Sequence, residues 1–137
     1  TDRGESGMLT SQDCVAALSV ERKMYLALSE FLDLTGELSD AVERQDQVSV
    51  QLFLNMRQEQ VNLLRDCKTL LRKQCRSLPG DAGKALRAIL SGEGSEATVS
   101  AELCRQVEKN RQLLERAVAA DRRLSRRMGG DKSFYGK

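Results

Sequence analysis

The sequence contains no histidine and no tryptophan, and its only proline is Pro79. Without histidine the chain lacks the side chain that most often serves as a general acid or base. It also cannot form the Glu-x-x-His pairs of di-iron helical bundles or the His-Glu-x-x-His pattern of zinc proteases. No nucleophile elbow is present. We therefore predict that the protein is not an enzyme and needs no metal and no cofactor.

Aromatic residues are also scarce, at 4% of the chain, whereas charged residues make up 31%. This composition suits long, surface-exposed helices better than a β-sandwich. A chain of 137 residues can form one domain with a buried core. We predict an all-α fold, in which a long antiparallel helical hairpin and a third long helix form a three-helix bundle of coiled-coil character.

Long apolar runs are absent as well, since none approaches the ~20 residues that a bilayer-spanning helix needs. We predict no membrane insertion. The net charge of +2 does not require nucleic acid as a partner. The run from Arg122 to Arg127 resembles a basic patch, but it has no interleaved aromatic residues. We interpret it as a helix end whose dipole favours cations, and we predict no nucleic-acid partner.

The four cysteines are not spaced like metal ligands or redox pairs: there is no Cys-x-x-Cys pair and no histidine to complete a zinc site. A free cysteine behaves as a small hydrophobic residue. We predict buried, reduced thiols within helices and a cytoplasmic location. The residues are Cys14, Cys67, Cys75 and Cys104.

Apolar residues at steps of three and four predict a helix over residues 11–45, after a flexible segment 1–9, and a second helix over residues 48–78. Thr10 and Asp13 have the spacing of an N-terminal cap. Asp46 and Ser49 are candidate caps for the second helix. No glycine or proline enforces a reversal between the two helices, so one unbroken helix over residues 11–77 is the alternative.

Polar residues interrupt both stripes, at Glu21 and Thr35 in the first helix and at Arg57 in the second. We interpret Arg57 as an aliphatic stem in the seam with its charged head in solvent. A pair with a carboxylate of another helix is the alternative.

Pro79 and Gly80 end the second helix. Residues 79–99 are expected to be a loop with a short helix possible in residues 81–90. The glycines around residues 91–95 predict a hinge or disordered loop, not a phosphate site, because no strand precedes them.

A third helix is predicted over residues 100–128, before a flexible tail at 129–137. Asn110 and Asp121 fill two polar gaps in its apolar stripe. Such a stripe packs against other helices or receives a partner's helix. Asn110 either fixes the register of the helices or bonds a loop carbonyl.

Charge predicts how the helices lie. The second half of the first helix is acidic, which its own dipole disfavours, and the end of the third helix is rich in arginine. We expect these two ends to lie side by side, with the third helix parallel to the first.

The end of the chain resembles a known family. The sequence Val-Glu-Lys-Asn-Arg-Gln-Leu-Leu at 107–114, the Gly129-Gly130 break and the final Phe134-Tyr135-Gly136-Lys137 resemble the end of FlgN-type flagellar export chaperones. The family is similar to this chain upstream too, with a long first helix, a short turn containing Asp as at Asp46, a second helix and a loose connection.

The resemblance implies a cytoplasmic helical chaperone. Such a protein binds the C-terminal amphipathic helix of hook-associated proteins, which form the hook–filament junction, and delivers them to the flagellar export apparatus. The predicted partner-binding residues lie on the third helix, where the other interpretation is that they form intramolecular core. They are Leu103, Val107, Asn110, Leu113, Leu114, Val118, Leu124 and Met128.

Phe134 and Tyr135 could belong to a flexible tail, fold back, or dock on a component of the export apparatus. The alternative function is a structural coiled-coil module that acts as a homodimer or scaffold.

Overall fold

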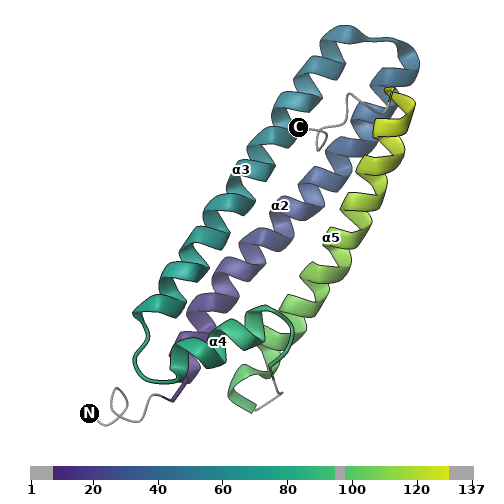
Figure 1. The fold of residues 1–137 in the computed structure, drawn as a ribbon. Helices are drawn as coiled ribbons and strands as arrows, with labels where there is room; N and C mark the ends of the chain where they lie inside the picture. The colour runs from purple at the N-terminus through teal and green to yellow at the C-terminus, as the bar shows by residue number, and fades with distance from the viewer. Residues whose placement is uncertain (1–7, 95–97, 130–137) are drawn as a thin grey trace.

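In the computed structural model, which describes residues 8–94 and 98–129, every regular element is helical, so the predicted all-α class is confirmed (Figure 1). The long helices are α2 (Ser11–Arg44), α3 (Gln47–Ser77) and α5 (Ala101–Arg127). The short helix α4 (Ala82–Leu90) and a 3-10 turn, η1 (Thr98–Ser100), lie between α3 and α5. Most of the predicted flexible ends, with Phe134 and Tyr135, lies outside the described residues.

Helix α2 starts with a capping box. The backbone N–H of Asp13 donates to Thr10 Oγ1 at 3.1 Å, and the backbone N–H of Thr10 donates to Asp13 Oδ2 at 3.0 Å. The two bonds satisfy donors that the first turn leaves without helical partners, as the spacing of these residues predicts.

The chain reverses at Gln45 and Asp46. Gln45 takes the left-handed conformation, with φ of 59°, and the backbone N–H of Asp46 donates to Ala41 O. Asp46 then caps α3. Its carboxylate accepts one hydrogen bond from the backbone N–H of Ser49 at 3.1 Å and a second from the hydroxyl of Ser49 at 2.7 Å. These bonds hold the pKa of Asp46 below its ordinary value. The reversal needs no glycine because the helix-end hydrogen bonds support the left-handed residue.

The three long helices share one central member. Helix α2 lies between α3 and α5 and packs against both (Figure 1). The side-chain amide of Gln74 donates to the backbone carbonyl oxygen of Asp13 at 2.9 Å, so the start of α2 lies beside the end of α3 and the two helices run in opposite directions.

Helix α5 runs in the same direction as α2. An ion pair of 2.9 Å joins Arg22 to Glu102 at the start of α5, and one of 3.3 Å joins Glu43 to Arg127 at its end. Arg127 also donates to Ser39. The acidic end of α2 therefore lies beside the basic end of α5.

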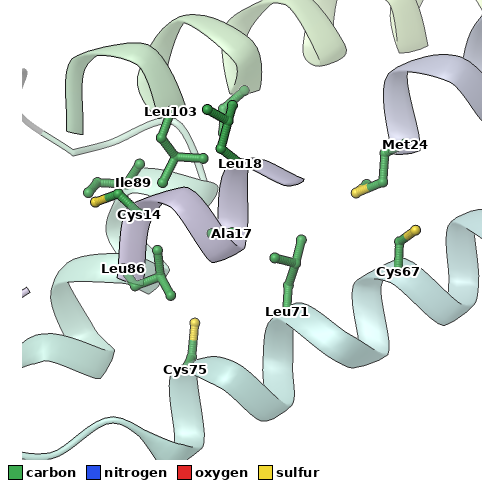
Figure 2. Packing of buried hydrophobic residues seen from close by; sticks show 11 residues of the cluster. Cys14, Ala17, Leu18, Met24, Cys67, Leu71, Cys75, Leu86, Ile89 and Leu103 are labelled. Atoms are coloured by element: carbon green, nitrogen blue, oxygen red, sulfur yellow. The ribbon is translucent and has the colours of Figure 1, made fainter. Parts of the chain in front are cut away.

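The main apolar core lies where α4 meets the long helices (Figure 2). Leu86 and Ile89 of α4 are buried there with Ala17 of α2, Leu71 of α3 and Leu103 of α5. Close packing requires Gly83 in α4, because a Cβ at this position would lie 2.3 Å from the carbonyl oxygen of Cys75. The short helix thereby ties the end of α3 to the start of α5.

Candidate partner-binding groove

A groove of about 800 Å³ lies over α2, between α3 and α5. Within the described residues α3 and α5 do not pack extensively on each other, because α2 separates them. Two helices that flank a third leave a furrow between their facing sides, and another helix can pack into such a furrow by ridges-into-grooves contacts.

The groove is mainly apolar. Met24, Leu28 and Phe31 of α2 line it, as do residues of both flanking helices and of α4. The apolar residues from the flanking elements are Val61, Leu64 and Leu71 of α3, Val107, Leu114 and Ala117 of α5, and Leu90 of α4. A surface of this kind matches the apolar face of an amphipathic helix.

The predicted partner-binding residues divide between the core and the groove. Leu103, Leu113 and Leu124 are buried and do not line the groove, so in this structure their surfaces are covered by the protein's own chain. Val118 and Met128 are half-buried and also lie outside it.

The remaining predicted residues line the groove. Val107 and Asn110 are buried in its lining, and Leu114 is the most accessible of the three, with 43% of its surface exposed. The accessible apolar surface of α5 in the groove is therefore centred on Leu114.

Asn110 is a polar point in this apolar lining. Its side-chain amide donates to Glu21 O at 2.8 Å and to Glu21 Oε1 at 2.6 Å, so it joins α5 to α2. Asn110 therefore bonds a helix partner and not a loop carbonyl. Burial raises the pKa of Glu21, while the bond from Asn110 and the charge of Lys68 act in the opposite direction.

A second polar cluster, formed by Arg57, Thr35 and Asp121, lies outside the lining of the groove. Arg57 of α3 forms an ion pair of 2.9 Å with Asp121 of α5 and donates to Thr35 Oγ1 of α2 at 2.9 Å. The guanidinium carbon of Arg57 also lies 4.6 Å from the centre of the Phe31 ring, in cation–π geometry. This pair connects the two helices that flank the groove.

The interpretation of Arg57 as a solvent-facing head on an aliphatic stem is therefore wrong. Its side chain is 1% exposed, as is that of Asp121. The physical reason is that two other helices supply partners at the same level, which allows the charge to be buried with its counter-ion.

Basic side chains border the groove. Arg65, Lys68 and Arg72 come from α3, Arg87 from α4 and Arg111 from α5, whereas among the described residues Glu21 is the only acidic one in the lining. Arg111 is already engaged, because it forms ion pairs with Glu108 at 2.5 Å and with Glu115 at 2.8 Å.

No group of His, Cys, Asp or Glu side chains in the described part of the chain is arranged to hold a metal ion. None of the four cysteines forms a disulfide, and Cys104 alone is half-buried, contrary to the prediction that all are buried. Burial raises the thiol pKa values of Cys14, Cys67 and Cys75, which keeps these thiols protonated.

The helices of residues 8–94 and 98–129 include none that is both long and apolar enough to cross a bilayer.

The sequence pattern indicated a binding surface on α5 alone, whereas α2, α3 and α4 supply most of the groove lining. The groove residues of α2 and α3 lie in the apolar stripes of their helices, and such a stripe looks the same in the sequence whether or not a neighbouring helix covers it. The width of the first stripe is no signal for the groove, because Leu18, Tyr25 and Leu32, which widen it, do not line the groove.

Comparisons of this chain with protein-family models, with curated proteins and with solved structures found no significant match.

Proposed function

We propose that this protein is a flagellar export chaperone that binds the C-terminal amphipathic helix of a hook-associated protein in the groove between α3 and α5. One observation carries the proposal: the apolar groove over α2 has helices on both sides and no helix of the described chain in it. The resemblance of residues 107–114 and 134–137 to FlgN-type chaperones supplies the identity of the client.

The acting unit in this proposal is one three-helix domain, with α2 and α3 as an antiparallel hairpin and α5 alongside. The client helix would take the place of a fourth helix of the bundle. Binding would hide an apolar face that otherwise promotes aggregation, and it needs neither ATP nor covalent chemistry. Release at the export apparatus in the cytoplasm would free the client for secretion.

The test is a titration of the protein with a synthetic C-terminal segment of a hook-associated protein, followed by calorimetry. We expect a one-to-one complex. Leu114→Asp places a charge in the groove, and we expect it to weaken binding about thirtyfold or more, the loss typical of a central contact residue. Circular dichroism should show unchanged helicity, because Leu114 is partly exposed.

Leu70→Asp is the matched control. Leu70 is 50% exposed on α3 but does not line the groove, so this variant should bind like the unmodified protein. Equal weakening by both substitutions, or the absence of any complex, would contradict the proposal.

The second candidate function is a homodimeric structural module. Leu52, Leu63 and Leu70 are large exposed hydrophobic residues on α3, and a second copy could cover them. This alternative predicts a dimer that persists on dilution in light-scattering measurements and that Leu70→Asp dissociates, whereas the chaperone proposal predicts a client complex that Leu70→Asp leaves intact.

A further inference from the structure

One end of the groove is closed. Helix α4 packs against both α3 and α5, and Arg87, Leu90 and Ser91 contribute to the lining at this end. A helix lying in the groove would meet α4 and could not continue in the same direction. An occupant must therefore end or turn at α4.

The closed end is also basic. Lys68 and Arg72 of α3 and Arg87 of α4 are all exposed and all line the groove. None of the three forms an ion pair with another described residue, in contrast to Arg111 on the opposite side of the groove. Arg72 donates to the uncharged hydroxyl of Thr69 at 3.4 Å, and the charge of Lys68 acts on the buried Glu21. Since no described carboxylate forms an ion pair with any of the three, their charges can attract an anionic group of an occupant.

The two ends of a helix differ in charge. The carboxyl end of a helix carries about half a negative charge from the aligned peptide dipoles. The last residue of a chain adds a full negative charge through its free carboxylate. The amino end carries the opposite partial charge, so a basic, closed end discriminates between the two directions in which a helix can enter.

We propose that the groove recognises the end of a polypeptide chain: the occupant is a partner's C-terminal helix, inserted with its terminal carboxylate against α4 among Lys68, Arg72 and Arg87. The inference rests on the proposed function in one respect, that the groove receives a client helix. It goes further by fixing the direction of that helix and by assigning recognition of the carboxylate to these residues.

The length of the groove sets how much of the client is bound. It extends along α3 from Val61 to Cys75 and along α5 from Val107 to Ala117. At about 1.5 Å per helical residue, these spans correspond to about 15–21 Å, or about 10–14 residues of a bound helix. The cavity accepts the apolar face of that helix, and its outer face remains in solvent.

The first experiment uses two synthetic amphipathic helices of about 14 residues, with leucine at helical spacing and alanine or glutamine elsewhere. One peptide ends in a free carboxylate, and its twin ends in an amide, which removes that charge. We expect the carboxylate peptide to bind about three- to tenfold more tightly in a fluorescence-anisotropy titration at low salt.

Charge reversal identifies the residues responsible. The double variant Lys68→Glu/Arg87→Glu should weaken binding of the carboxylate peptide about tenfold and should remove its advantage over the amidated twin. Lys73→Glu/Lys84→Glu is the matched control. It makes the same change in charge at exposed positions on the same two helices, outside the groove, and should preserve the advantage.

Direction is read independently by NMR with a nitroxide on the peptide. A label at the carboxyl end should broaden the amide signals of Leu90 and Gly92, and a label at the amino end should broaden that of Val61. The reverse pattern, or equal affinity of the carboxylate and amidated peptides, would overturn the inference.

Failure of the inference is distinguishable from failure of the proposed function. If a hook-associated segment binds in a way that Leu114→Asp abolishes, but equally well with its carboxylate amidated, the chaperone function stands and recognition of the chain end is refuted. If only the synthetic carboxylate peptide binds, recognition of the chain end stands and the chaperone function is refuted. If neither peptide nor segment binds unless residues 130–137 are deleted, the protein's own tail is the occupant, and both proposals fail.

Discussion

Removing the Asp121 carboxylate should destabilise the protein more than any exposed charge change. Asp121→Ala leaves the guanidinium of Arg57, whose side chain is 1% exposed, without its counter-ion. Breaking a buried pair in this way typically costs about 3–5 kcal/mol. That is a large part of the ~5–15 kcal/mol by which a domain is usually stable.

The cost belongs to the unpaired charge and not to the pair itself. Replacing both partners with apolar residues, as in Arg57→Met/Asp121→Leu, removes both buried charges together. The hydroxyl of Thr35 still donates to Phe31 O at 2.8 Å in this double variant, so no buried donor is left there. We expect the double variant to lie within about 1.5 kcal/mol of the unmodified protein.

Urea unfolding followed by far-ultraviolet circular dichroism measures both effects. Glu102→Ala, which breaks the exposed pair with Arg22, serves as the control and should cost at most about 1 kcal/mol. The reasoning is refuted if Asp121→Ala is as mild as this control, or if the double variant is no more stable than Asp121→Ala.

Two further predictions concern stability. Burial raises the pKa of Glu21, so the folded state binds the proton of this carboxyl group more tightly than the unfolded state does. The resulting stabilisation is fully present below about pH 4.5, the ordinary pKa of the group, and is lost as the pH rises through the raised pKa. Glu21→Gln keeps an acceptor for Asn110 and should remove this component from urea midpoints measured across the pH range; an unchanged profile would contradict the assignment. Gly83→Ala forces its Cβ against the Cys75 carbonyl and should lower the free energy of unfolding by about 1–3 kcal/mol, with a lower melting temperature. The Cβ of Gly36→Ala meets nothing within 4 Å, and this variant should raise the free energy of unfolding by about 0.5–1 kcal/mol, with a higher melting temperature. Equal effects at the two glycines would show that packing around Gly83 is not limiting.

The helical periodicity was sufficient to predict the all-α class and the buried stripes. It also marked the positions that depart from the stripes: Glu21, Thr35, Arg57, Asn110 and Asp121. What the pattern could not supply is their pairing, because that depends on the register of three helices distant in sequence. The pattern of its own helix predicts that the charged group of Arg57 faces solvent. In the folded bundle Asp121 of α5 lies at the same level and forms an ion pair with it.

The groove could not be predicted from the sequence, for a different reason. Leu28, Leu64 and Leu114 satisfy the same apolar spacing as the core residues around them, but a space remains between the helices at their level. Periodicity reports which face of a helix is apolar, and it does not report whether a neighbour covers that face. The basic closed end could not be predicted either, because Lys68 and Arg87 lie on different helices and only the packing of α4 brings them together.

The two buried polar clusters have a mechanical consequence for the groove. The Glu21–Asn110 bonds hold α5 to α2 within it, and the Arg57–Asp121 pair holds α5 to α3 beyond its far end. Sliding α5 by one turn would leave charged or amide groups buried opposite apolar side chains, so the helix has a single permitted position. The groove is therefore formed without an occupant, and in our proposal little of the binding energy of a client helix would be needed to open it.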